Sequence, residues 1–523
     1  MDFIKKDIHM CQNIGEKCSE LTIDEDFNIP DTKGDIEKLI AKQSRVVIDD
    51  ISCDEGRLKV SGNLWFQLAY LVSGENPDVE FFSRFIPFED NIAMDCINRN
   101  NRPDVFSTIE DFSIEVINSR KLSVRALVQS CVYVCAPKDK EIICGLENSQ
   151  GVECLTDKIC VTERPIFCQD VFHIKEELEI PQNKPNIAEV LWSDVSLRNM
   201  DFRAIPDGVR VTGNVEIFSI YKSEEEHLPI QYVYVVRSIN QDISMPGVEE
   251  DMISDIKCAL GKGEVSIRPD ADGEDRVIGI DYNANVNVSL YVEHTTEFLK
   301  DAYSPQINLS PVYEAMTVDN LLMHNRVKTP LTQRRRVDGD AGRLMQICHI
   351  FGDVLVDDYW YEDGLHISGI VKVCVLYVAS GNEPISAMNA VIPYEQLVEL
   401  PDAEAFVSDG GNITDCIRIS ASINELSANM INSEEIDIKT ELNLDIMAFS
   451  KKQVGFVTNI EVAPIDKEKK SAAPGIVGYV VAEGDTLWSL ARRYYATTDS
   501  IREINELESD DIKPGDRLLI MKS

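Results

Sequence analysis

Positive charge is scarce in this sequence of 523 residues. It holds 51 Lys and Arg against 90 Asp and Glu, which gives a formal net charge of −39. Nucleic acids and anionic membranes are bound through clustered Lys and Arg side chains. The balance therefore argues against both as partners. It leaves two uses for the acidic surplus, either a solubilising surface or a face that meets a partner protein.

Long apolar runs are missing as well. No run approaches the length of about 18 residues that a membrane-spanning helix needs. The early lysines, Lys5 and Lys6, are followed by no apolar core of the signal-peptide kind. These absences predict a protein that inserts into no membrane and stays in the cytoplasm where it is made.

Cysteine occurs fourteen times, but in no recognisable framework. The residues are scattered singly inside apolar runs, as Cys131 and Cys374 are. Such placement is typical of buried thiols in a reducing compartment. Cys131 and Cys135 lie four residues apart, yet no second pair supplies further zinc ligands. We expect every cysteine to be reduced and none to hold a metal.

Catalytic patterns are also absent. The seven histidines form no His-Glu-x-x-His pair, and the short glycine phrases lack the complete phosphate-loop pattern. The sequence therefore predicts no catalytic residues, no metal and no cofactor. An enzyme with an unrecognised site in the repeats described next remains the remote alternative.

Three segments repeat one apolar ladder. Each has apolar residues at every second position, a glycine four residues after the first of them and a tyrosine twelve after it. An Asp-Gly-type turn precedes each segment. Period two predicts a strand with one face in a core, and the turn predicts a hairpin before it. The segments are Leu58–Tyr70 with Gly62, Val209–Tyr221 with Gly213, and Leu365–Tyr377 with Gly369.

The ladders predict a mainly β fold of three tandem antiparallel repeats, each a twisted sheet or sandwich with few helices. The start of the third repeat is open, because residues 308–336 look irregular. An N-terminal segment is expected to be a helix plus a linker. The predicted ranges are 1–26 for this segment and 27–150, 178–306 and 337–450 for the repeats.

The last 48 residues have a different pattern. After a polar stretch, 464–475, that we expect to be a flexible linker, residues 476–523 read as an aromatic strand, a Gly-Asp-Thr turn, two short amphipathic helices and an apolar strand. Leu487, Leu490, Ala491 and Tyr494 follow the spacing of a helical core face. This order resembles a LysM module, a small βααβ domain best known for binding N-acetylglucosamine polymers.

The LysM resemblance implies a groove between the turn at Gly484 and the loop before the last strand. That loop is acidic, and residues 475–523 hold six Lys or Arg against nine Asp or Glu. Trp488 lies off the core stripe, so it is either an interface anchor or a lid over a small core. The candidate partner-binding residues are Gly484, Asp485, Thr486, Leu487, Trp488, Tyr495, Ser509, Asp510, Asp511, Ile512 and Lys513.

The ladders resemble the SPOCS-type domains of clostridial spore coat proteins, and three of them before a LysM module resemble the SipL-type family. The resemblance implies a non-enzymatic adaptor, made in the mother-cell cytoplasm and recruited to the forespore surface. Its LysM module would bind stage IV sporulation protein A, the coat ATPase, and its repeats would meet other coat proteins. The alternative is a peptidoglycan- or N-acetylglucosamine-binding protein that acts through LysM at the cortex or wall.

Overall fold

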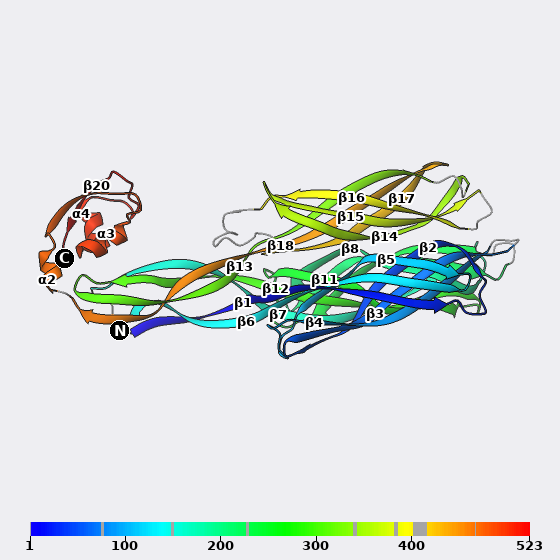
Figure 1. Cartoon of the computed structure of the whole chain (residues 1–523), viewed down its shortest axis with the longest axis horizontal. Helices are drawn as coiled ribbons and strands as arrows, with labels where there is room; N and C mark the ends of the chain where they lie inside the picture. Colours follow the sequence, from blue (N-terminus) through cyan, green and yellow to red (C-terminus); the bar gives the residue numbers. More distant parts are fainter. Residues whose placement is uncertain are drawn as a thin grey trace.

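The chain is elongated, with a broad body of strands, a narrower stalk and a small module at the stalk's far end (Figure 1). The computed structural model describes residues 2–74, 78–147, 151–225, 230–337, 342–380, 385–400, 416–465 and 467–523. Almost every element of the body and stalk is an antiparallel strand. The predicted fold class, three β-rich repeats followed by a small βααβ module, is confirmed.

Each repeat is a pair of three-stranded sheets with the same strand order. In the first repeat, β3 and β6 are the central strands, and their apolar faces pack together through residues such as Leu64, Phe66, Val124 and Val128. One sheet orders β2 (Ile36–Asp54), β3 (Arg57–Val72) and β4 (Val79–Ala93), and the other orders β1 (Asp2–Asn28), β6 (Lys121–Glu147) and β5 (Asp104–Asn118).

The second and third repeats follow the same plan. The second pairs β8 (Ile187–Ile205), β9 (Gly208–Ser223) and β10 (Ile230–Ser244) with β7 (Glu153–Glu179), β12 (Asp275–Tyr303) and β11 (Ile253–Pro269). The third pairs β14 (Leu344–Tyr361), β15 (Leu365–Ala379) and β16 (Ser386–Val398) with β13 (Ile307–Arg336), β18 (Glu435–Pro464) and β17 (Ile417–Asn432).

The predicted ladders are the central strands β3, β9 and β15, and their glycines occupy equivalent places. Each glycine faces an irregularity in the neighbouring strand, where the register shifts after Ile48, Arg198 or Val356. At such a bulge the backbone of the neighbour approaches closely. The repeated glycine therefore marks the point where no side chain fits.

Replacing Gly369 by alanine is expected to lower the free energy of unfolding by about 2 kcal/mol or more. A Cβ there would collide with the backbone oxygen of Leu355 and with the Tyr394 hydroxyl, which donates to that oxygen at 3.0 Å. Gly455 on β18 is the matched control, because a Cβ at that position has nothing within 4 Å. Denaturant midpoints should fall for Gly369→Ala and stay for Gly455→Ala, and equal midpoints would contradict the crowding.

Two sequence-based expectations about long segments are wrong. The segment 1–26 was expected to be a helix plus a linker, but its described residues 2–26 belong to strand β1, which pairs with β6 from Asp2 opposite Glu147 to Asn28 opposite Lys121. Residues 308–336, expected to be irregular, belong to β13, which pairs with β18. Both segments carry many polar residues on their exposed side, so the alternation of apolar and polar residues is weak. Their strand conformation depends on pairing with the neighbouring strand.

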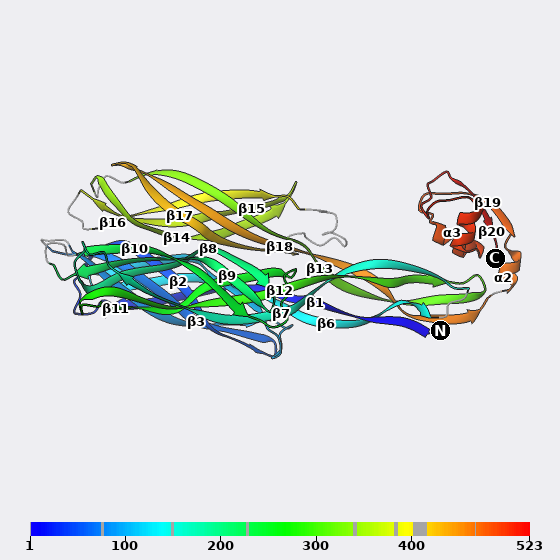
Figure 2. The same ribbon diagram turned by 180° about the vertical axis from the view of Figure 1, so that it is seen from behind.

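The stalk consists of three two-stranded ribbons, one from each repeat (Figure 2). They are the continuations of β1 with β6, β7 with β12, and β13 with β18 beyond the body. Each ribbon contributes apolar side chains to a shared core, such as Ile142, Phe298 and Phe456. A ribbon alone is marginally stable in water, and the three together bury a common interior.

The three repeats also meet in the body, through their other sheets. Trp192 of the second repeat is 1% exposed, and its ring lies between Phe81 of the first repeat and Phe351 of the third, at 6.3 and 5.8 Å. Beside it, His349 lies 2.8 Å from the carboxylate of Asp194, to which Gln43 donates a hydrogen bond of 2.7 Å. Side chains from all three repeats thus fix how the repeats are placed.

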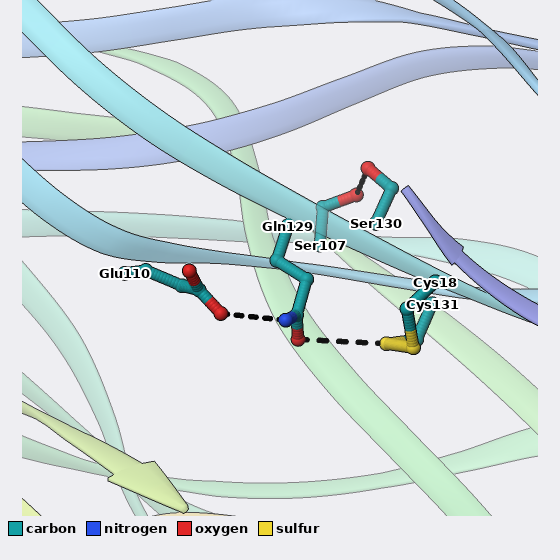
Figure 3. Close-up of a disulfide and its surroundings, with 6 residues drawn as sticks. All are labelled: Cys18, Ser107, Glu110, Gln129, Ser130 and Cys131. Atoms are coloured by element: carbon teal, nitrogen blue, oxygen red, sulfur yellow. Dashed lines mark hydrogen bonds between the residues drawn. A yellow bond between two sulfur atoms is a disulfide. The ribbon is translucent and has the colours of Figure 1, made fainter. Parts of the chain in front are cut away.

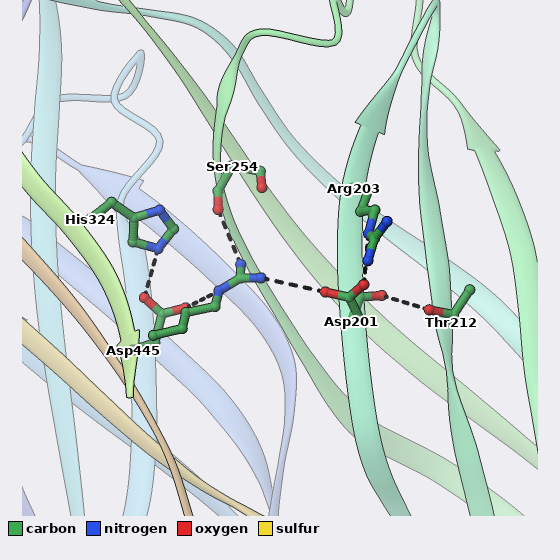
Figure 4. Close-up of polar contacts among 7 residues, drawn as sticks. Asp201, Arg203, Thr212, Ser254, His324 and Asp445 are labelled. Carbon is green, nitrogen blue, oxygen red and sulfur yellow. Dashed lines mark hydrogen bonds and ion pairs between the residues drawn. The ribbon is translucent and has the colours of Figure 1, made fainter. Parts of the chain in front are cut away.

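A further polar link joins the second and third repeats (Figure 4). Arg326 on β13 donates to Asp445, 3.1 Å away, and to the backbone oxygen of Ser254 on β11, 3.2 Å away. It also lies 3.9 Å from the carboxylate of Asp201 on β8. One guanidinium therefore connects strands of two repeats.

Acid should weaken the contact between repeats at Asp194. Burial alone would raise the pKa of this carboxyl, but the hydrogen bonds from His349 and Gln43 outweigh it and hold the pKa at about 2. A lowered folded-state pKa gives stability that is present above the unfolded value of about 3.9 and is lost as pH falls toward 2. The stability advantage over Asp194→Asn should shrink by about 2 kcal/mol between pH 5 and pH 2. Urea unfolding at both pH values measures it, and a constant difference would contradict the pairing.

One expectation about the cysteines is also wrong. Cys18 and Cys131 form a disulfide (Figure 3). They stand directly opposite each other on β1 and β6, with Cα atoms 4.0 Å apart. The sequence could not indicate this pair, because it depends on β1 being the neighbour of β6. The other cysteines for which a state is described form no disulfide.

Candidate functional site

The C-terminal module brings together the two segments that were predicted to border a groove. Strands β19 (Ile476–Val480) and β20 (Arg517–Met521) pair antiparallel, and α3 (Leu487–Tyr494) and α4 (Thr498–Ile504) lie between them in the chain. The predicted core stripe is confirmed at Leu487, Leu490 and Ala491, which are buried, and Tyr494 packs partly against them. The fold of the module is therefore set by its own short-range pattern.

The turn from Gly484 to Leu487 is built by local hydrogen bonds. Gly484 has a φ of +84°, which favours glycine. The carboxylate of Asp485 accepts from the Ala482 N–H at 2.9 Å and from the Tyr479 hydroxyl at 2.7 Å, and these bonds lower its pKa. Thr486 caps α3 in a reciprocal capping box with Ser489. Asp485 and Thr486 thus have structural partners and are also accessible.

The second side of the groove is the loop from Ser509 to Lys513. Its end is tied to the first turn, because the Val481 N–H donates to the Asp516 oxygen at 2.9 Å and the Gly515 N–H donates to the Val481 oxygen at 2.8 Å. The two segments therefore lie at the same end of the module, as the resemblance implied. Ser509, Asp510, Asp511 and Lys513 are exposed, whereas Ile512 packs partly into the module core.

Trp488 and Tyr495, the two predicted aromatic contacts, lie elsewhere. Trp488 packs edge-on against Tyr303 of the stalk, with ring centroids 4.7 Å apart. Tyr495 ends α3 in a left-handed conformation, and its backbone oxygen accepts from Ser523. The structure thus brings together the groove residues but places the Trp488 side chain in a contact within the chain.

We call this contact the docking contact; it is formed by Asp301 and Tyr303 of β12 with Trp488, Arg492 and Ala496 of the module. Asp301, 15% exposed, accepts from Trp488 Nε1 at 2.9 Å and pairs with Arg492 at 2.6 Å. The Tyr303 hydroxyl donates to the Ala496 oxygen at 2.8 Å. Sequence reasoning missed Asp301 and Tyr303, because no local pattern links them to a module almost 200 residues away.

The stretch between stalk and module is more ordered than expected. Within the predicted flexible linker, α2 (Lys467–Ala472) is helical. The Lys470 ammonium donates to the Pro305 oxygen at 2.8 Å, and the Lys522 ammonium donates to the Ala473 oxygen at 2.8 Å. These bonds connect the linker to both the stalk end and the module.

The arrangement has the features of a binding surface. Among the residues that the structure describes, no three His, Cys, Asp or Glu are grouped so as to hold a metal ion. In the same ranges, no helix has the length and apolar character for crossing a membrane. The two segments of the predicted groove offer backbone groups, short polar side chains and carboxylates at the far end of the stalk.

Comparisons with known proteins identify both kinds of domain. The family model described as SipL, SPOCS domain matches residues 35–117, 186–268 and 344–431, inside the three predicted repeats. The LysM domain model matches residues 479–520. The exact boundaries given above stay predictions. These families are binding and structural domains, not enzyme families.

One curated relative is 46% identical over 52 residues, the probable endopeptidase p60 of Listeria grayi. The similarity covers 9% of this chain and 10% of that protein. The match thus spans about a tenth of the relative's length, too little to compare the whole proteins. No solved structure matches the chain.

Proposed function

Because this chain belongs to the SipL type, a sporulation-related family with SPOCS repeats and a LysM domain, we propose that it is a non-enzymatic adaptor of spore coat assembly. In this proposal the LysM groove binds stage IV sporulation protein A, the coat ATPase. The protein is made in the mother-cell cytoplasm and is recruited to the forespore surface through that contact. The observation that carries the proposal is the combination of three SPOCS repeats with an exposed LysM groove at the far end of the stalk.

The position of the groove supports an adaptor. The stalk separates the LysM domain from the body, so a partner held at one end leaves the repeats accessible at the other (Figure 1). The repeats carry exposed apolar side chains, such as Tyr234 and Val236 on β10, that offer docking surfaces to other coat proteins. Aromatic and apolar anchors dominate the binding energy of protein interfaces.

The experiment compares the full chain with a variant that lacks residues 476–523. We expect the full chain to bind stage IV sporulation protein A and the shortened chain to lose about thirtyfold or more in affinity, equal to about 2 kcal/mol. Calorimetry or biolayer interferometry measures it. Equal affinities of the two proteins would contradict a LysM-mediated contact.

A charge substitution locates the surface within the domain. Asp511→Lys, in the groove, should weaken the complex about tenfold, because a rim charge of the wrong sign opposes association. Glu503→Lys, at another exposed carboxylate, on α4 and outside the groove, is the matched control and should change affinity by less than about threefold. If both variants bind alike, the groove is not the contact.

The second candidate is binding of N-acetylglucosamine polymers at the cortex or wall. The match to the LysM domain model favours it, because LysM modules are best known for binding such polymers. Chitin oligomers and peptidoglycan fragments should be titrated beside the ATPase. Tight glycan binding with no affinity for the ATPase would replace the adaptor proposal by this one.

A further inference from the structure

Two cysteines lie side by side where the stalk leaves the body. Cys11 on β1 and Cys135 on β6 are on the same strand pair as the disulfide between Cys18 and Cys131. Cys11 lies opposite Pro137 and Cys135 lies opposite Asn13, so the two side chains are diagonal neighbours on one strand pair, and both line the same small cavity. Neither sulfur is in a disulfide, and Cys135 is 7% exposed. The two sulfurs are thus close, unoxidised and held by a sheet.

Two arginines, one from each of the other repeats, lie near this pair. Arg418 on β17 of the third repeat donates to the Cys135 sulfur over 3.5 Å and lies against the rings of Tyr133 and Phe449. Arg164 on β7 of the second repeat is buried nearby, with its side chain 7% exposed, and pairs with Asp104. Buried guanidinium groups favour a thiolate over a thiol. Cys135 is therefore the sulfur whose negative charge the nearby guanidinium groups stabilise.

The pKa values of the two cysteines are shifted in opposite directions. The neighbouring Cys11 thiol lowers the pKa of Cys135, burial opposes that shift, and Arg418 and Arg164 lower the pKa further. The same neighbour and burial raise the pKa of Cys11. Together with the contact from Arg418, these shifts favour Cys135 as the sulfur that ionises.

A small cavity gives access to both sulfurs. It measures about 20 Å³ and is lined by Cys11, Cys135 and Cys416 together with Glu16 and Lys451, whose side chains are exposed. A cavity of about 10–15 Å³ already holds one water molecule. Hydrogen peroxide is only one oxygen larger than water, so a small oxidant fits where a larger one does not.

We propose that Cys135 and Cys11 form a peroxide-reactive dithiol, with Cys135 as the sulfur that is attacked first by the oxidant and Cys11 as the sulfur that resolves it. The Cys135 thiolate attacks one peroxide oxygen, the O–O bond breaks, and hydroxide leaves and takes up a proton as water. The sulfenic acid that remains is attacked by Cys11, which loses its proton as the S–O bond breaks and a second water leaves. Two electrons pass from the two sulfurs to one peroxide.

The product is a second disulfide between β1 and β6. It links the N-terminal strand to the body at the base of the stalk, so oxidation fastens the strand that begins the first ribbon. The inference rests on residues of the repeats and is independent of the partner that the LysM groove binds.

The test treats the full-length protein with one equivalent of hydrogen peroxide, blocks the remaining thiols and maps the peptides without reduction. We expect a Cys11–Cys135 linkage, with Cys135 consumed about tenfold or more faster than Cys374. Cys374 is the internal comparison, since it is 5% exposed and burial raises its pKa to about 12. Equal rates for Cys135 and Cys374 would overturn the proposal, whatever any variant does.

Two variants assign the roles. Cys11→Ser should stop at a sulfenic acid on Cys135, which a cyclic dione traps. Cys416→Ser, which changes another sulfur of the same cavity, should leave the linkage unchanged. A linkage from Cys135 to Cys416 in the unaltered protein would show that Cys11 is not the resolving residue, and the proposal would then fail.

Discussion

Replacing Trp488 by glutamate is expected to release the LysM domain from the stalk, weakening the docking contact about thirtyfold or more, equal to about 2 kcal/mol. The substitution removes the ring that packs against Tyr303 and the N–H that Asp301 accepts. It also places a second carboxylate beside Asp301, which is only 15% exposed. Like charges in a partly desolvated contact repel strongly.

Hydrogen–deuterium exchange of the full-length protein measures this release. Peptides from the end of β12 should exchange faster in Trp488→Glu, while β19 and α3 keep their protection because Leu487, Leu490 and Ala491 still form the module core. Tyr303→Ala removes the stalk's ring from the contact and should release the domain as well. Trp360→Glu, the same change at a tryptophan of the body, is the control. Unchanged exchange at the end of β12 in both docking variants would contradict the contact.

The same variants separate docking from partner binding. If the partner uses the exposed groove, Trp488→Glu and Tyr303→Ala should both bind stage IV sporulation protein A within about threefold of the unaltered chain. A loss in Trp488→Glu alone would mean that the ring itself contacts the partner, as one interpretation of the sequence proposes.

Trp192→Ala should lower the free energy of unfolding by about 3–5 kcal/mol, the largest effect of a single substitution that we expect in the body. The side chain is 1% exposed and packs between rings of the first and third repeats. Its loss leaves a cavity where three repeats meet, and the surrounding sheets are too rigid to fill it. Denaturant unfolding followed by circular dichroism measures the loss.

Two companion variants test whether the loss comes from the cavity between the repeats. Within the described residues the Trp192 indole N–H has no hydrogen-bond partner, so Trp192→Phe should cost only about 1 kcal/mol. Trp360→Ala, at a partly exposed tryptophan stacked on His366, should cost a similar small amount. A large loss in Trp192→Phe would show that the polar edge matters, and a small loss in Trp192→Ala would show that the repeats do not depend on this contact.

The short-range pattern of the sequence determined the kind of element and its repetition. The ladders at Leu58, Val209 and Leu365 could be identified because period two, a turn before the strand and a glycine within it are all local features. The LysM fold was equally accessible, since its core stripe lies within one short helix and the capping residue Thr486 directly precedes it. Fold class followed from such features, and the resemblance to known families added the domain type.

The tertiary structure alone decided which strands pair and which surfaces remain free. β1 became a strand because β6, more than a hundred residues away, supplies its hydrogen bonds, and the same pairing places Cys18 opposite Cys131 and Cys11 beside Cys135. Trp488 lies against Tyr303 for a similar reason, because the ribbon of β12 reaches the module. Hydrophobic periodicity shows that a segment needs a partner, but the free energy that selects the partner comes from contacts between segments far apart in the chain.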